Sequence, residues 1–270
     1  MDPIISAIDP SFNISHFINA LNLQKKRPTL VHINKEILKT LVAQYNYKSC
    51  LIGHTHLVDL KTFNPSWSSH PRLKKNTRKA KNKGIHIQEL DYKTLCQKQI
   101  KQLQDDWLHQ KRGPKHFHTF INDPFSYQKH KDTRCFAAFK NKKMIAIRFF
   151  TTQKDHLIAQ NTFYKKDSPN GTNAYLLSEA LLHFKKEGFK SCDLGLAPLD
   201  HLSKKNNQPF LDLLQRLAKF FLSPIYDFDG VCLFKAQFKA KKKACYLAYT
   251  GLNPILPTLR VLLKIFRLSK

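Results

Sequence analysis

Residues Asn170–Ala197 read NGTNAYLLSEALLHFKKEGFKSCDLGLA. The dipeptide Asn170-Gly171 is typical of a turn, and the segment 174–187 carries apolar side chains at helical spacing. Gly188 is suited to end this helix, because glycine adopts the left-handed conformation of a C-cap without steric cost. The apolar run 189–197 then predicts a strand. A helix that leads directly into an apolar strand is the crossover unit of an α/β sheet.

The flanking sequence predicts further elements of both kinds. Strand patterns cover residues 28–33, 49–53, 56–60, 85–90, 134–140, 143–151, 156–164, 231–238 and 244–249. Helical patterns cover residues 35–45, 72–83, 92–109 and 210–221. Because antiparallel meanders alternate with α/β crossovers in this order, we expect an α+β sheet of the acyltransferase type, with a helix between its middle strands.

Composition points to a folded, strongly basic protein of 270 residues. Hydrophobic residues at 42% and aromatic residues at 11% exclude a disordered basic tail, and only 8 glycines exclude a glycine-rich low-complexity chain. Lys and Arg number 46 against 19 Asp and Glu, so the formal net charge is +27. Such a charge suits nucleic acid, an anionic membrane surface, or both. The alternative is a set of lysines that are simply solvated.

Compartment and metal signals are few. The six cysteines are scattered without a C-x-x-C pair, which fits a reducing cytoplasm and gives no zinc pattern. The acidic start of the sequence lacks the basic segment of a signal peptide, and no apolar run reaches the roughly 18–20 residues of a membrane span. The pairs His54-x-His56 and His116-x-His118 share a strand face, but no carboxylate or cysteine stands at helpful spacing. We therefore expect no metal.

Two basic segments stand out. In residues 72–83, seven of twelve side chains are basic, and a helix gathers Lys74, Lys75, Arg78 and Lys79 on one surface. This surface suits RNA phosphates or anionic lipid headgroups, and a solvated helix face is the third reading. A second basic run covers residues 235–243 and has the same ambiguity.

The last residues, 257–270, form an amphipathic pattern. Pro257 can open a helix whose apolar side includes Phe266, and the remaining side carries Arg260, Lys264 and Arg267. A cationic face opposite an apolar face suits a helix that lies in a membrane interface. The alternative is a terminal helix docked on its own core.

Catalytic signatures are sparse. There is no G-x-S-x-G, Walker or G-x-G-x-x-G motif, and no two glycines lie within two residues of each other, so the pyrophosphate loop of coenzyme-A-dependent acetyltransferases is missing. The carboxylate pairs Asp105-Asp106 and Asp227/Asp229 suit caps or turns better than a dyad. Asp193, inside an apolar strand, must be either buried and paired or placed at a cleft, which makes it the candidate catalytic residue.

Several stretches together resemble one known family. The block Cys192-Asp-Leu-Gly-Leu-Ala-Pro-Leu199 follows the helix that ends in Lys185-Lys-Glu-Gly-Phe189. Further blocks are Leu57-Val-Asp-Leu60, Asp105-Asp-Trp-Leu108, Tyr226-x-Phe-x-Gly230, Leu233-Phe-Lys235 and Tyr246-Leu-Ala-Tyr249. In this order they resemble the C-terminal cytosolic domain of phosphatidylglycerol lysyltransferases, the aminoacyl-phosphatidylglycerol synthases. The resemblance covers residues 28–268 and is strongest over 174–249.

The resemblance implies a tandem GNAT-like fold, with a shortened first repeat in residues 1–70, a complete catalytic repeat in 71–250 and a basic amphipathic helix in 251–270. It implies transfer of a lysyl-like aminoacyl group from charged tRNA to the hydroxyl of a phospholipid such as phosphatidylglycerol, on the inner face of the cell membrane. No cofactor, coenzyme A or metal is expected. The alternatives are a GNAT-like transferase with a non-lipid acceptor and an inactive RNA- or membrane-binding module of the same fold.

The resemblance also implies site residues. Asp193, Gly195, Ala197, Trp107 and Lys235 match the family pattern, with Asp193 orienting the amino group or a water and the amides of 194–197 polarising the ester. Lys235 and Arg78 would hold phosphate or the tRNA acceptor end. The family's Asp-Leu-x-Arg stretch falls on residues 160–163, which read QNTF, so Gln160 takes the place of the Asp. A family arginine falls at Cys232, and an acidic residue is replaced near Gly113-Pro114.

Overall fold

The computed structural model describes residues 14–23, 28–66, 70–91, 95–111, 133–202 and 209–251. The chain divides into two compact units. Unit 1 consists of Met1–Thr55, Leu196–Phe220 and Lys242–Lys270, and unit 2 of His56–Gly195 and Phe221–Lys241. Strands β2 (Lys48–Asp59) and β7 (Ser191–Pro198) contribute residues to both.

Unit 2 is built on the expected meander. Strands β4 (Thr133–Lys140), β5 (Lys143–Gln153) and β6 (His156–Tyr164) pair antiparallel, and β3 (His86–Leu90) pairs antiparallel with β4. β6 pairs with β7 in parallel, so the strand order in this unit is β2-β7-β6-β5-β4-β3. The parallel pair requires a crossover, and α6 (Thr172–Lys186) provides it.

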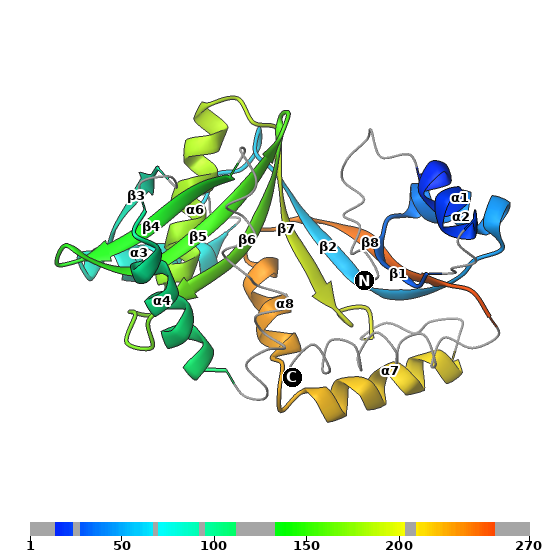
Figure 1. Cartoon of the computed structure of the whole chain (residues 1–270). Coiled ribbons are helices and arrows are strands. Elements are labelled where there is room, and N and C mark those ends of the chain that lie inside the picture. Colours follow the sequence, from blue (N-terminus) through cyan, green and yellow to red (C-terminus); the bar gives the residue numbers. More distant parts are fainter. Residues whose placement is uncertain are drawn as a thin grey trace. The chain divides into compact units, whose positions relative to one another are not determined.

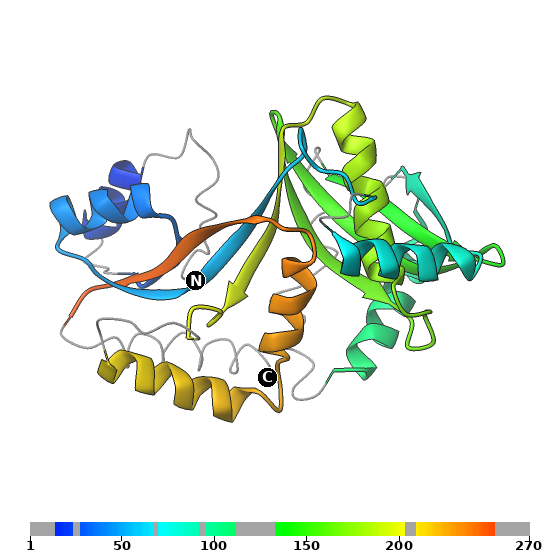
Figure 2. The same ribbon diagram turned by 180° about the vertical axis from the view of Figure 1, so that it is seen from behind.

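Helices α6 and α3 (Pro71–Asn82) cover one face of this sheet (Figures 1 and 2). The core between them and the sheet includes Leu73, Leu177 and Phe184. The two helices approach closely at Gly171, where a β-carbon would lie 2.2 Å from the Asn76 carbonyl oxygen. Gly171 also has φ +95°, a backbone conformation that other residues rarely adopt. Both the close contact and the backbone conformation therefore require glycine at the start of α6.

Helix α4 (Gln97–His109) packs against the other face of the meander (Figure 1). Strand alternation explains the division, because Cys135 and Ala137 face α4 whereas Phe136 and Ala138 face α6. Both faces of these strands are therefore buried, which accounts for their nearly continuous apolar sequence.

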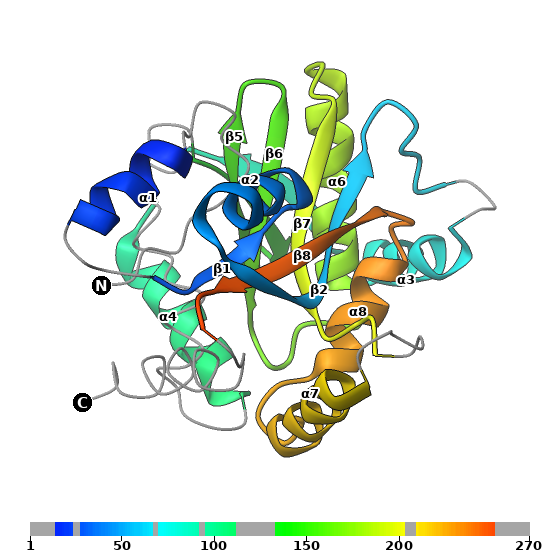
Figure 3. The same ribbon diagram turned by 90° about the vertical axis from the view of Figure 1, so that its right-hand side faces the viewer.

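Unit 1 has strand order β1-β8-β2-β7, with β1 spanning Leu30–Ile33 and β8 spanning Lys241–Tyr249. Helices α1 (Ile14–Leu23) and α2 (Lys35–Tyr45) pack on these strands, and their shared core includes Ile18, Leu30 and Leu41 (Figure 3). Asn34 caps α2 by accepting a hydrogen bond from the Ile37 amide at 2.8 Å. Helix α7 (Pro209–Leu222) begins in this unit.

Two of the predicted strand assignments differ from the structure. Residues 231–238, predicted as a strand, belong mainly to helix α8 (Phe228–Ala236), because Asp227 caps its start by accepting a hydrogen bond from the Gly230 amide at 2.8 Å. The two strands predicted at 49–53 and 56–60 are one strand, β2, since Gly53 continues the chain at φ +149°.

The other predicted elements are confirmed, although α4 begins at Gln97 rather than near residue 92. The amphipathic segment 257–270 lies outside the described residues. The assignment of residues 1–70, 71–250 and 251–270 to repeats and a terminal helix stays a prediction.

Candidate functional site

Asp193 lies near the end of the buried part of β7 in unit 2. Its Oδ1 accepts a hydrogen bond from the Gly195 amide at 2.7 Å, and Gly195 adopts φ +80°. This carboxylate-to-amide bond closes a tight local turn and uses one carboxylate oxygen. Within the described residues the other oxygen, Oδ2, has no hydrogen-bond partner, so it remains available to a ligand.

Lys235 brings a buried ammonium group to the same turn. It is the last-turn lysine of α8 and is only 9% exposed. A β-carbon on Gly195 would lie 3.6 Å from Lys235 Nζ, so the ammonium reaches the backbone at Gly195. A carboxylate and an ammonium therefore flank one glycine, and such a pair can hold both an amino group and a developing negative charge.

Arg148 is a second buried cation in unit 2. Its Nε donates to Thr162 Oγ1 at 2.5 Å and its Nη2 donates to Asn173 Oδ1 at 3.2 Å. Burial lowers the pKa of the Arg148 guanidinium to about 10. Its hydrogen-bond partners in the described residues are neutral, which leaves its positive charge uncompensated by any carboxylate hydrogen bond.

The remaining substrate residues implied by the resemblance occupy different surroundings. Gln160 in β6 donates to Thr151 Oγ1 at 3.4 Å. Trp107 is buried in the core under α4, edge-on to Phe163 with ring centroids 5.4 Å apart. Ala197 is fully buried and belongs to unit 1. Asp193, Gly195 and Lys235 are thus the predicted residues that unit 2 brings together.

The four basic side chains predicted for phosphate binding share one exposed helix. Lys74, Lys75, Arg78 and Lys79 lie on α3 and are all exposed, whereas Leu73 and Ala80 face the core. Asn76 donates to Gln237 at 3.0 Å, which fixes the helix on its opposite side. Arg260, Lys264, Phe266 and Arg267, predicted to contact membrane, lie outside the described residues.

A polar network in unit 1 was not anticipated from the sequence. His54 Nδ1 lies 2.7 Å from Asp200 Oδ1, and Lys242 Nζ lies 2.7 Å from Asp200 Oδ2. His201 Nε2 lies 2.7 Å from Gln215 Oε1, and Gln215 Nε2 donates to the Leu51 carbonyl at 2.7 Å. His54 and Asp200 are 146 positions apart, so no local spacing could reveal the pair.

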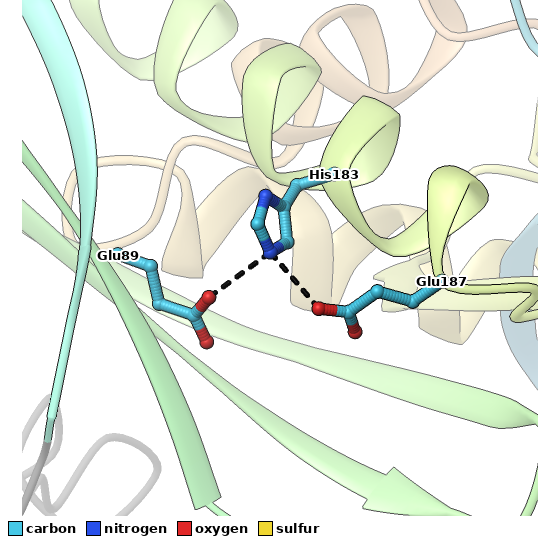
Figure 4. Close-up of side chains that lie close together, drawn as sticks. All are labelled: Glu89, His183 and Glu187. Atoms are coloured by element: carbon cyan, nitrogen blue, oxygen red, sulfur yellow. Dashed lines mark ion pairs between the residues drawn. The ribbon is translucent and has the colours of Figure 1, made fainter.

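Glu89, His183 and Glu187 form the group of described residues whose ligand atoms are close enough to hold a metal ion (Figure 4). His183 Nε2 lies 3.1 Å from Glu89 and 2.9 Å from Glu187. Arg134 already donates to both carboxylates, which holds the pKa of Glu187 below its ordinary value. We therefore interpret this partly exposed group as an ion-pair network that fixes β3, β4 and α6 to one another.

Among the described residues, no helix combines the length and the apolar character needed to cross a bilayer.

Comparisons with known proteins agree on one family. A family model described as "Phosphatidylglycerol lysyltransferase, C-terminal" matches residues 1–249. A phosphatidylglycerol lysyltransferase of Bacillus subtilis (strain 168) is 23% identical over 263 residues, which are 95% of this chain but only 30% of that protein.

Two solved structures share the fold. L-PGS from Bacillus licheniformis is 20% identical with a TM-score of 0.73, over 95% of this chain and 78% of that one. A DUF2156 C-terminal domain from Agrobacterium fabrum is 18% identical with a TM-score of 0.69, over 92% of this chain and 75% of that one. The expected α+β fold class is thereby confirmed.

Proposed function

This chain belongs to the family of phosphatidylglycerol lysyltransferase C-terminal domains, and from that premise we propose that it is an aminoacyltransferase. The donor in this proposal is a charged tRNA carrying a lysyl-like aminoacyl group. The acceptor is the hydroxyl of a membrane phospholipid such as phosphatidylglycerol. The observation that carries the proposal is the turn at Gly195, where a buried carboxylate and a buried ammonium flank the same backbone.

The proposed reaction needs little covalent machinery. An aminoacyl ester is already activated, so positioning and stabilisation of the developing oxyanion can supply most of the rate. In the proposal, Asp193 Oδ2 holds the α-ammonium of the aminoacyl group. Lys235 stabilises the negative charge that develops on the ester oxygen or holds a phosphate.

The exposed cations of α3 fit the donor. Each phosphate that a lysine or arginine neutralises adds salt-dependent affinity, and four such side chains follow one helix. We assign Lys74, Lys75, Arg78 and Lys79 to the tRNA backbone in this proposal. The net charge of +27 would support the approach of any polyanion at long range.

Helix α7 supports a peripheral position on the membrane. Leu213, Leu217, Phe220 and Phe221 recur at helical spacing, and each is 45% to 73% exposed. An exposed apolar stripe on a strongly basic protein is complementary to an anionic phospholipid surface, which offers both hydrocarbon and negative charge. We propose that surface as the occupant of this face.

The test is incubation of the chain with lysyl-tRNA and phosphatidylglycerol vesicles, followed by lipid analysis. We expect aminoacylated lipid from the unmodified chain, and a loss of about 100-fold or more in Asp193→Asn, because the amide cannot neutralise an ammonium. Asp229→Asn, a change in the first turn of α8, is the matched control. No lipid product with any charged tRNA would reject the proposal. Transfer to a soluble amine or peptide instead would favour a non-lipid acceptor.

A further inference from the structure

Arg148 is a buried positive charge in unit 2 whose described hydrogen-bond partners are all neutral. The residue is 6% exposed, and it donates to the Thr162 hydroxyl at 2.5 Å and to the Asn173 side-chain oxygen at 3.2 Å. Burial lowers the pKa of the guanidinium to about 10, and no described carboxylate lies near enough to offset that shift. The group is therefore still charged at neutral pH, and buried charges are normally paired.

Arg134, on the neighbouring strand β4, shows how this sheet compensates another arginine. Its Nε donates to Glu89 at 2.6 Å and its Nη2 donates to Glu187 at 2.8 Å. Two carboxylates thus share the Arg134 guanidinium, whereas no described carboxylate bonds to Arg148. Because an uncompensated buried charge destabilises a fold, Arg148 points to a counter-ion that the described residues do not supply.

Thr162 and Asn173 do not depend on Arg148 for their own hydrogen bonding. The Thr162 hydroxyl donates to the Asn173 side-chain oxygen at 2.8 Å, so the two side chains are bonded to each other. Removal of the guanidinium would leave that bond in place. The charge of Arg148 is therefore not needed to satisfy its buried polar neighbours, which favours a role in binding.

Hydrogen-bond donors remain free beside the guanidinium. Nε and Nη2 of Arg148 are engaged, but Nη1 donates to no described residue. Asn173 is the second residue of α6, so Arg148 is bonded to the first turn of that helix. In this turn the backbone amides of residues 173 and 174 donate to no described acceptor, although the amides on either side of them do.

These donors suit a small phosphate group. Backbone amides at a helix start and an arginine side chain are the usual donors to phosphate oxygens, and the helix dipole adds partial positive charge. A tetrahedral phosphate presents oxygens in several directions, so it can accept from the side chain and from the backbone together. Asn173 is partly exposed, which gives the first turn of α6 a border with solvent. Because Arg148 itself is only 6% exposed, the backbone of a folded RNA is too large to reach it.

We infer that Arg148 and the first turn of α6 bind a small phosphate anion, either the phosphodiester of a glycerophospholipid headgroup or free inorganic phosphate. The headgroup source rests on the proposed function, in which the acceptor is phosphatidylglycerol. The phosphate site itself does not rest on it, because the site follows from the uncompensated guanidinium and the free amides of α6.

The test is isothermal titration calorimetry on the full chain with two probes. One probe is inorganic phosphate, and the other is glycerophosphoglycerol, the deacylated form of phosphatidylglycerol. A background of about 0.15 M sodium chloride screens exposed charges beyond about 8 Å, which suppresses weak binding to the lysines of α3. We expect saturable binding to one site, and a loss of about tenfold or more in Arg148→Met, because charge-assisted hydrogen bonds are removed.

Arg134→Met is the matched control, since it removes an arginine from the neighbouring strand. It should keep the phosphate affinity within threefold and lower the melting temperature, because two carboxylates lose their partner. Arg148→Met should show the reverse, with a lost phosphate affinity and a melting temperature in phosphate-free buffer that is unchanged or higher. Added phosphate should raise the melting temperature of the unmodified chain but not that of Arg148→Met.

A second variant keeps the inference testable if Arg148→Met fails to fold. Arg148→Gln is that variant, and circular dichroism checks both. Phosphate affinity of either folded variant within threefold of the unmodified chain would overturn the inference, and so would the absence of saturable binding of both probes up to about 10 mM. Tighter binding of the diester would assign the site to a lipid headgroup, and tighter binding of inorganic phosphate would assign it to the free anion.

The titrations contain neither tRNA nor a bilayer, so their outcome does not depend on turnover. If phosphate binds through Arg148 but the chain forms no aminoacylated lipid, the proposed function fails and the phosphate site stands. If the chain forms aminoacylated lipid while Arg148→Met binds phosphate as tightly as the unmodified chain, the phosphate site alone fails.

Discussion

At the scale of single residues, His201 connects proton binding with folding. Burial lowers its folded-state pKa below the ordinary value of 6.5, so the unfolded chain binds the proton more readily. The contribution of a neutral His201 is therefore complete above about pH 6.5 and is lost as pH falls through the folded pKa. We expect the free energy of unfolding, measured by urea titration, to fall as the pH drops below about 6.5. His201→Gln should flatten that part of the profile, and an unchanged profile would contradict this account.

Gly53 is a residue where a single methyl group decides the packing. A β-carbon there would lie 2.3 Å from the Ala197 carbonyl oxygen, and the backbone is at φ +149°. We expect Gly53→Ala to lower the free energy of unfolding by about 3–4 kcal/mol, since neither backbone can move without breaking strand pairing. Gly84→Ala is the matched control, because Gly84 has φ +73° but no atom within 4 Å of its β-carbon position. It should cost only about 1–2 kcal/mol. Equal losses in the two variants would show that the close contact carries no energy.

At the scale of elements, α3 offers a clean electrostatic test. Lys75 and Lys79 are exposed one turn apart on α3, and Lys98 and Lys101 are exposed in the same way on α4. If α3 binds the tRNA backbone, Lys75→Gln/Lys79→Gln should reduce the slope of log affinity against log salt by about 1.5, at roughly 0.7–0.9 per phosphate contact. Lys98→Gln/Lys101→Gln should leave the slope nearly unchanged. Equal slopes in both double variants would mean that only the total charge matters.

The elements also show how far sequence patterns reach. The helix and strand predicted at 174–187 and 189–197 are α6 and β7, because turn, apolar period and C-cap glycine all agree there. For residues 231–238 the sequence offers no such combination of signals, because a short apolar run fits a strand or a helix equally well. The hydrogen bond from the Gly230 amide to Asp227 identifies this segment as a capped helix, and that bond is visible only in the structure.

The polar residues of the two units likewise include some that the sequence can reveal and some that it cannot. Asp193 could be predicted because a charged residue inside an apolar strand must be either paired or part of a site. Arg148 in β5 is also a charged residue in an apolar strand, but the sequence analysis did not single it out. The pair of His54 with Asp200 depends on the packing of β2 beside the end of β7. The two residues are 146 positions apart in the sequence, so their pairing appears only in three dimensions.

At the scale of the whole molecule, net charge and the apolar face of α7 should make separable contributions to membrane binding. A charge of +27 attracts anionic vesicles at low salt, but at 1 M salt charges are screened beyond about 3 Å. Burial of apolar side chains is not screened. Binding that persists at 1 M salt therefore reports the exposed leucines and phenylalanines of α7.

We expect Leu213→Ser/Leu217→Ser to weaken this salt-resistant binding to phosphatidylglycerol vesicles by about 30-fold, since burying the exposed part of each leucine contributes roughly 1 kcal/mol. The matched control is Leu23→Ser/Val42→Ser, because these side chains are exposed on α1 and α2. Lys75→Gln/Lys79→Gln should weaken only the low-salt component. Vesicle sedimentation across a salt series measures both components. Loss of all binding at 1 M salt in the unmodified chain would contradict an apolar contact through α7 and leave electrostatic attraction as the whole of the interaction.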